Sequence, residues 1–339
     1  MKYGRRGFLA AAFSTGLALT FGASGAKAAR RIEKHRPITP SKTLVRSRSA
    51  PLKRARTALV PFETAPFPYH GTMPGSNEPF LNVNEGGRKG HRTASGRIYW
   101  EDQTYNDNRV LLHIPKGFDI RRPALMLVFF HGHGATLERD VLDRQKVPAQ
   151  ISASNANVVL VAPQLAVDAR DSSAGKFWQP GAFGRFIGEA GQQLARLQGD
   201  RRSLRTFASM PIILVAYSGG YVAAASAIER GGLKKRVRGV VLLDSLYGDL
   251  DKFAHFIEGD PSAFFVSVYL SSTRNQNNRF ENILTAHDVD VSPEINTRLA
   301  SGGVAVVPGG GGRHRDLVTH AWVDYPIIDL LKRLPEYRR

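Results

Sequence analysis

The sequence contains no cysteine among its 339 residues. Without a thiol, the chain cannot form disulfide bonds, thiolate zinc sites or iron–sulfur clusters, and it cannot use a cysteine nucleophile. Long apolar runs are also missing, since no stretch after the first 28 residues approaches the ~18 apolar residues typical of a membrane span. Apolar residues still make up 42% of the chain and charged residues 22%, which is enough apolar material for a folded core.

Acidic side chains are almost absent from the first 60 residues, which hold 14 Lys and Arg and one acid, Glu33. The other 279 residues hold 33 basic and 28 acidic side chains, so most of the net charge of +18 belongs to the N-terminal segment. A nucleic-acid-binding domain carries its basic side chains on the folded body. The near-neutral body therefore argues against a nucleic-acid partner.

Residues 1–28 have the pattern of an export signal. Arg5-Arg6 precede a moderately apolar run at 8–23, and 26–28 reads Ala-Lys-Ala, with small residues at the two positions that a signal peptidase reads. The paired arginines resemble a twin-arginine signal, although Gly4 stands where Ser or Thr is usual. The resemblance implies a periplasmic or secreted protein, with the twin-arginine export machinery as a partner and no stable membrane span after processing.

The rest of the chain divides into two parts that differ in proline content and apolar periodicity. Residues 29–90 hold many prolines and little apolar periodicity, which predicts a basic, Pro-rich extended tail or linker. Residues 91–339 are expected to fold, with apolar β-rich segments at Arg97–Tyr99, Val110–Ile114, Ala124–Phe130, Val158–Ala162, Ile212–Ala216, Val237–Leu243, Phe264–Leu270 and Val304–Val307. Continuous runs such as LMLVFF are typical of strands covered on both faces. Helical patterns at 183–197, 221–230 and 327–334 complete the prediction of a doubly wound, mostly parallel sheet of the α/β class.

The strongest motif surrounds Ser218. An apolar strand at Ile212–Ala216 leads into Ala216-Tyr217-Ser218-Gly219-Gly220 and then into an Ala-rich helical segment. A nucleophilic serine on a sharp strand-to-helix turn needs small residues two positions away on either side, because larger side chains would meet neighbouring backbone. Ala216 takes the place of the usual first glycine, and Gly220 provides the second small residue.

A second motif, His131-Gly132-His133-Gly134, follows a buried strand. Glycines there let backbone N–H groups approach a developing oxyanion, so His133, Gly134 and Gly219 are the predicted oxyanion-hole residues. An alternative is that His131 and His133 ligate a metal, since alternate histidines can share a zinc ion.

The order of these motifs resembles the α/β-hydrolase superfamily over residues 97–335. The resemblance implies an eight-stranded α/β-hydrolase sheet, a catalytic domain at 91–339 and a nucleophile, acid and histidine in that chain order. Asp244, at the end of the strand after Ser218, is the preferred acid. Asp288 and Asp290 are the alternative candidates for this acid.

Two histidines near the C-terminus could serve as the base. The prediction favours His320, which precedes the last helix, and keeps His314 as the alternative because two arginines flank it and would disfavour an imidazolium. Trp178, Tyr247 and the polar run Arg274–Asn278 are expected near the pocket.

The sequence thus predicts an exported serine hydrolase that cleaves an ester or amide through an acyl-enzyme without a cofactor, with a cell-envelope substrate suggested by its location. Two other functions stay open: a metal-assisted hydrolase built on His131 and His133, and a non-catalytic envelope-binding protein on a hydrolase scaffold.

Overall fold

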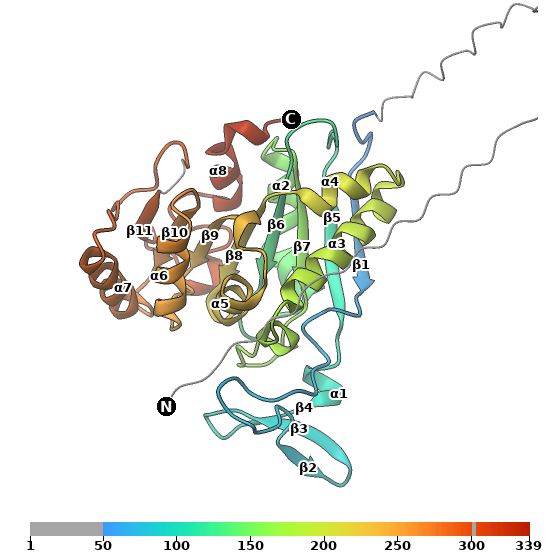
Figure 1. Cartoon of the computed structure of the whole chain (residues 1–339), viewed down its shortest axis with the longest axis vertical. Coiled ribbons are helices and arrows are strands. Elements are labelled where there is room, and N and C mark those ends of the chain that lie inside the picture. Colours follow the sequence, from blue (N-terminus) through green and yellow to red (C-terminus); the bar gives the residue numbers. More distant parts are fainter. Residues whose placement is uncertain (1–49, 300–302) are drawn as a thin grey trace, which may run out of the picture. The chain divides into compact units, whose positions relative to one another are not determined.

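The computed structural model describes residues 50–299 and 303–339 (Figure 1). The leader predicted for residues 1–28, and the part of the predicted tail up to residue 49, lie outside the described residues. Among the helices of the described part, none has the length and apolar character needed to cross a membrane.

Eight strands of the described chain form one central sheet. In spatial order they are β1 (Arg56–Pro61), β5 (Arg109–Ile114), β7 (Val158–Pro163), β6 (Leu125–Phe130), β8 (Ile212–Tyr217), β9 (Val237–Leu243), β10 (Phe264–Tyr269) and β11 (Val304–Pro308). β5 is antiparallel to both of its neighbours, and every pair from β7 to β11 is parallel. This arrangement confirms the predicted mostly parallel, eight-stranded α/β-hydrolase sheet.

The continuous apolar strands are buried on both faces, as their sequences predict. In β6, Met126, Val128 and Phe130 belong to one core cluster and the alternating residues Leu125, Leu127 and Phe129 to the other. Successive side chains of a strand point to opposite faces, so both sets need an apolar partner layer.

Helices supply these layers (Figure 1). One core cluster is completed by side chains of α3 (Ala182–Gln198), α4 (Ser203–Ser209), α5 (Tyr221–Arg230), α6 (Leu250–Gly259) and α7 (Arg274–Ala286). The other is completed by the π-helix η1 (Leu137–Arg144), α2 (Val147–Ala153) and α8 (Pro326–Lys332). The shorter helices are α1 (Glu101–Thr104) and the 3-10 turns η2 (Gly175–Trp178), η3 (Ser218–Gly220), η4 (Lys234–Arg236), η5 (His314–Asp316) and η6 (Pro335–Tyr337).

The boundary predicted at residue 90 between tail and folded domain is wrong. β1 pairs with β5 inside the main sheet, and β2 (Val83–Glu85), β3 (Arg88–Arg92) and β4 (Ile98–Trp100) form a separate antiparallel sheet. β4 corresponds to the first predicted strand, so that segment lies in the small sheet rather than the large one. A cluster that includes Phe67, Phe80 and Tyr105 packs beside the small sheet and gives the proline-rich region a core of its own.

The sheet register brings the chemically promising loops to one edge. Phe130 lies opposite Ala216, and Ala216 lies opposite Leu242, so β6, β8 and β9 end side by side. The residues that follow these three strands are the His131–Gly134 segment, Ser218 and Asp244. Ligands of open α/β sheets bind beyond the carboxyl ends of the strands.

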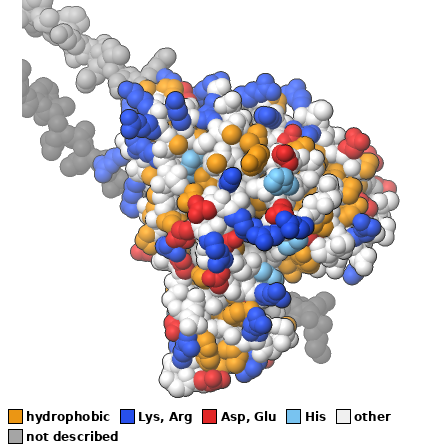
Figure 2. All heavy atoms as spheres, turned by 180° about the vertical axis from the view of Figure 1, so that it is seen from behind, with side chains coloured by type: hydrophobic (Ala, Val, Ile, Leu, Met, Phe, Trp, Pro, Cys, Tyr) orange, Lys and Arg blue, Asp and Glu red, His pale blue; other side chains and the backbone are white. Residues whose placement is uncertain are grey.

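On the face that Figure 2 shows, Lys and Arg side chains form a band across the middle of the body.

Candidate active site

Ser218 sits on a strained turn between β8 and α5. Its φ of 53° lies in the left-handed region that a residue with a Cβ rarely adopts. The serine is 7% exposed, and its carbonyl accepts a 2.7 Å hydrogen bond from the buried Ser245 hydroxyl. The turn thus holds the hydroxyl of Ser218 at the edge of the sheet, as the motif predicts.

The small residue at position 220 is required by the backbone of the neighbouring strand. A Cβ on Gly220 would lie 2.5 Å from the carbonyl oxygen of Phe130. Such a contact between a Cβ and a fixed backbone atom does not occur in real structures, so the turn cannot keep this position with a larger residue. The clash anticipated for the Ser218 motif therefore has a specific origin in β6.

His314 is the imidazole that contacts Ser218. Its Nε2 lies 2.9 Å from Ser218 Oγ, and its Nδ1 lies 2.6 Å from Asp244 Oδ2. The Tyr217 ring stacks on the imidazole with centroids 5.2 Å apart, and the Tyr217 hydroxyl donates to the His314 carbonyl at 3.0 Å. Burial raises the pKa of Tyr217 to about 12, so this hydroxyl keeps the proton that it donates. One tyrosine thus fixes both the ring and the backbone of His314.

The preference for His320 is corrected by this geometry. The His320 ring contacts Thr319 at 2.9 Å and lies 3.8 Å from the exposed Asp324, and its side chain is 58% exposed. Arg313 and Arg315 flank His314 along the chain, but the partner of its ring, Asp244, comes from the end of a distant strand. The carboxylate of Asp244 bonds to Nδ1 and so turns Nε2 toward Ser218.

Asp244 is fully buried and accepts several hydrogen bonds. Its oxygens take the Leu270 N–H at 3.0 Å and the hydroxyls of Ser272 and Thr273, besides His314 Nδ1. Burial acts to raise the pKa of Asp244, but the hydrogen bonds outweigh it and hold the pKa below its usual range. Asp244 is therefore a stable carboxylate that can orient an imidazole.

Two of the three predicted oxyanion-hole residues, Gly219 and His133, keep a backbone N–H without a partner among the described residues. Gly219 is at the start of the 3-10 turn, where backbone N–H groups have no partner within the helix. The N–H of His133 makes no hydrogen bond with another described residue. The N–H of Gly134, in contrast, donates to the Ala169 carbonyl at 2.9 Å, so the prediction for Gly134 is wrong.

The His133 side chain lies directly over Gly219. A Cβ at position 219 would be 2.3 Å from the His133 ring, whose Nε2 hydrogen bonds to Ser172 Oγ at 2.7 Å. Burial lowers the pKa of His133, which favours the neutral ring. The ring thus forms a wall of the site and keeps residue 219 a glycine.

His131 is a structural residue of the core. The His131 Nε2 accepts the Leu165 N–H at 2.8 Å and lies 2.9 Å from Gln164 Nε2, while Nδ1 lies 2.8 Å from the Gly132 carbonyl. Both ring nitrogens are therefore occupied by protein groups, and the ring joins the ends of β6 and β7. In the described residues, no group of three or more His, Cys, Asp or Glu side chains is placed to hold a metal ion.

This buried imidazole predicts acid sensitivity of the fold. Burial lowers the pKa of His131 to about 4, against about 6.5 in an unfolded chain. Between these values the unfolded chain binds more protons, so the free energy of unfolding falls as the pH falls from about 6.5 to about 4 and changes little below. We expect His131 to account for a loss of about 2 kcal/mol between pH 7 and pH 5.

Urea unfolding at the two pH values measures this loss. His131→Gln should reduce the pH dependence by about that amount, whereas the exposed His255→Gln should leave it unchanged. Equal pH dependence in all three proteins would contradict the assignment.

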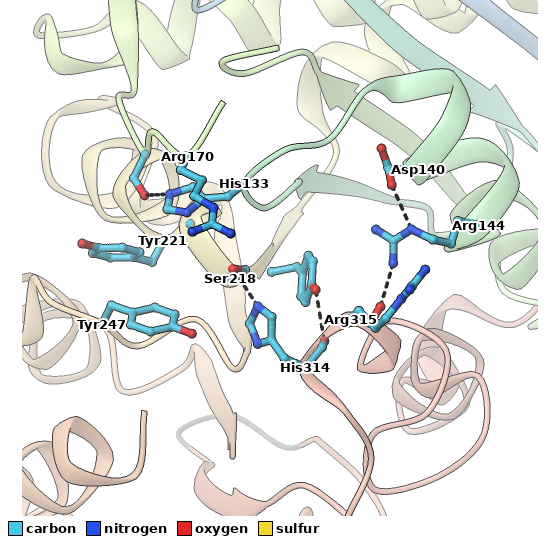
Figure 3. A pocket seen from close by; sticks show the side chains of 12 residues that line it. His133, Asp140, Arg144, Arg170, Ser218, Tyr221, Tyr247, His314 and Arg315 are labelled. Carbon is cyan, nitrogen blue, oxygen red and sulfur yellow. Dashed lines mark hydrogen bonds and ion pairs between the residues drawn. The ribbon is translucent and has the colours of Figure 1, made fainter. Parts of the chain in front are cut away.

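An open cavity of about 790 Å³ surrounds Ser218 (Figure 3). Its lining is formed by His133, Asp140, Arg144, Arg170, Ser172, Tyr217, Ser218, Gly219, Tyr221, Tyr247, His314 and Arg315. Tyr247 is thus in the pocket, as expected. The three arginines were not anticipated, because they come from η1, from the loop after β7 and from η5, and no local motif connects these segments.

Other residues expected at the site lie elsewhere. Trp178 packs against Tyr69, with ring centroids 5.8 Å apart, and does not line the cavity. Residues 274–278 begin α7, where the buried Asn277 side chain bonds to Ser267 and Thr273. The polar run therefore anchors a helix, and the adjacent hydroxyls at 272 and 273 hold Asp244. The alternative acids Asp288 and Asp290 are exposed and do not contact His314.

No family model matches the sequence, and no curated protein matches it. Solved structures with a similar arrangement include a mutant of the feruloyl esterase module from Clostridium thermocellum complexed with sinapinate, with 13% identity, TM-score 0.44, and coverage of 80% of this chain and 96% of that one. An S-formylglutathione hydrolase from Agrobacterium tumefaciens matches with 10% identity, TM-score 0.43, and coverage of 76% and 98%. A thermostable esterase from Pseudomonas putida matches with 14% identity, TM-score 0.41, and coverage of 76% and 86%.

Proposed function

We propose that this chain is a serine hydrolase that cleaves a carboxylic ester or amide. The observation that carries the proposal is the hydrogen-bonded series from Ser218 Oγ to His314 Nε2 at 2.9 Å, and from His314 Nδ1 to Asp244 Oδ2 at 2.6 Å. A hydroxyl, an imidazole and a carboxylate in this order are the recurring means of activating a serine.

In the proposed reaction, His314 takes the Ser218 proton while Oγ attacks the substrate carbonyl carbon. The N–H groups of Gly219 and His133 stabilise the negative charge that forms on the carbonyl oxygen. His314 then gives the proton to the departing alcohol or amine, which leaves an acyl group on Ser218. Water activated by the same imidazole releases the acid and restores the serine. Asp244 keeps Nδ1 protonated and Nε2 directed at Ser218 throughout.

The other two functions have less support. A metal-assisted reaction would need His131, whose two nitrogens already bond to protein groups. A purely binding role would leave the strained turn at Ser218 without a purpose, since backbone strain of this kind costs on the order of 1–3 kcal/mol.

We also propose that the protein acts in the periplasm or outside the cell. The proposal rests on the Arg5-Arg6 leader and the small residues at 26–28. A cell-envelope ester or amide would then be within reach.

A fluorophosphonate probe tests the proposed chemistry, because an activated serine attacks its phosphorus, displaces fluoride and becomes phosphonylated. We expect one label, mapped to Ser218 by peptide mass spectrometry, on the wild-type protein and on Ser172→Ala. Ser172 lies in the same cavity and provides the matched control. Ser218→Ala should take no label, and a chelator should change neither labelling nor ester turnover. A label at another residue, or an unlabelled wild-type protein, would reject the proposal.

A further inference from the structure

We propose that the pocket selects substrates carrying a negatively charged group, a carboxylate or a phosphate, close to the scissile bond. This inference rests on the proposed hydrolase function and concerns the substrate of that same site. In the part of the chain that the structure describes, three arginines line the cavity around Ser218, and Asp140 is the only carboxylate in the lining. Figure 3 shows Arg170 beside His133, and Arg144 and Arg315 on the other side of Ser218.

Asp140 cannot neutralise this set of charges. It bonds to Arg144 Nε at 2.8 Å, to Arg139 Nε at 2.9 Å and to the Thr136 N–H at 2.9 Å. Burial acts to raise the pKa of Asp140, but these partners outweigh it and lower the pKa, so the group stays ionised. Its single charge is thus shared between two arginines, of which one lies in the cavity.

Arg170 and Arg315 keep positive charge available to a ligand. The Arg170 guanidinium makes no ion pair or hydrogen bond with another described residue. Among the described residues, Arg315 forms one ion pair, with Asp316 at 3.8 Å, and Asp316 is bonded more closely by Arg313 at 3.1 Å. A guanidinium presents a planar set of N–H donors that match carboxylate and phosphate oxygens.

Arg144 has a different task. Its second nitrogen donates to the backbone carbonyl of Arg315 at 2.7 Å, so the Asp140–Arg144 pair holds the segment that carries both Arg315 and His314. Arg315 is thereby kept in the cavity lining next to the proposed base. Arg170, which has no ion pair among the described residues, and Arg315, which has only the 3.8 Å contact to Asp316, are therefore the specificity-determining residues of the proposal.

Matched esters test the selection. Monomethyl glutarate and methyl valerate have chains of similar length and differ by a terminal carboxylate, so they report on charge in the acyl group. The acetyl esters of glycerol 3-phosphate and of glycerol report on a phosphate in the alcohol. We expect wild-type kcat/KM to favour the charged member of at least one pair by about tenfold, corresponding to about 1.4 kcal/mol. Because the cavity is open, the preference should shrink as salt is added.

The double variant Arg170→Gln/Arg315→Gln should reduce the preference to within about twofold while turnover of the neutral ester persists. Arg205→Gln on α4 is the control for loss of a surface arginine, since Arg205 is exposed and lies outside the cavity lining. It should keep the full preference. A wild-type enzyme that hydrolyses the neutral esters equally well, or a preference that survives the double variant, would overturn the proposal.

Labelling of Ser218 by the fluorophosphonate separates this inference from the proposed function. A labelled protein without charge preference contradicts only the inference, whereas an unlabelled protein without turnover contradicts both. Ligands that slow labelling of Ser218 compare charged and neutral compounds without any turnover. Glutarate should slow labelling of the wild type more than glutaramide does, and the double variant should show no difference.

Discussion

His314→Ala is expected to lower kcat/KM for a hydrolysable ester by about 10⁵-fold, equivalent to about 7 kcal/mol of transition-state stabilisation. Without the imidazole, Ser218 has no group to take its proton, and the departing alcohol has no donor. Ser218→Ala should cost about as much. The double variant Ser218→Ala/His314→Ala should be no worse than either single variant, because the residues act as one unit.

His320→Ala supplies the matched control for this prediction. Both histidines follow β11, six positions apart, and only His314 contacts Ser218. His320→Ala should keep kcat/KM within about twofold of the wild type, as expected for a surface substitution with no contact to the site. Steady-state kinetics gives kcat/KM of each variant, and thermal unfolding curves show whether the variant is folded. Together they distinguish a loss of catalysis from a loss of folding. A large loss in His320→Ala with an active His314→Ala would refute the proposed base.

The sequence predicted the parts of the site that short-range patterns encode. LMLVFF and IILVAY are apolar at every position because helices cover both faces of the sheet, so β6 and β8 could be recognised without knowing their neighbours. Small residues around Ser218 reflect a turn whose clearance depends on the Phe130 carbonyl. Asp244 followed from the rule that active-site groups lie at the carboxyl ends of parallel strands.

The parts that were missed depend on contacts between distant segments. Choosing between His314 and His320 required the direction of a side chain after a run of four glycines, and that direction is set by Tyr217 and Asp244. The N–H of Gly134 donates to the carbonyl of Ala169, which lies in a loop whose path no sequence motif predicts. Both errors arose because a local pattern shows which residues could act in the site, whereas their hydrogen-bond partners come from distant segments.

The ordered region before residue 90 was missed for a related reason. β1 reads RTALVP, which is short, half exposed and close to several prolines. It is a strand because β5, about fifty residues later, provides an edge with unpaired backbone groups. Propensity alone favours a linker here, and tertiary pairing overrides it.

Asp244→Asn is expected to lower kcat/KM by about 10⁴-fold while the protein stays folded. The carboxylate now accepts four hydrogen bonds, from Leu270, Ser272, Thr273 and His314. An amide has one oxygen, so its NH₂ group must face at least one of these donors. If it faces Nδ1, the imidazole has to carry its proton on Nε2 and can no longer accept the proton of Ser218. The loss should therefore appear in kcat, with KM little changed.

Supporting variants distinguish the charge of Asp244 from its position. Ser272→Ala and Thr273→Val each remove one donor while leaving the carboxylate, so each should cost about a hundredfold or less in kcat, since a hydrogen bond to a charged group contributes about 1.5–3 kcal/mol. Because those donors hold the pKa of Asp244 below its usual range, the stability they provide is present above the unfolded pKa and is lost as the pH falls through the lower folded value. Both variants should therefore show a weaker loss of stability with acid than the wild type.

If Asp244→Asn retained most of the wild-type kcat, the carboxylate would be a structural anchor for residues 270–273, and the proposed role of Asp244 in orienting His314 would fail.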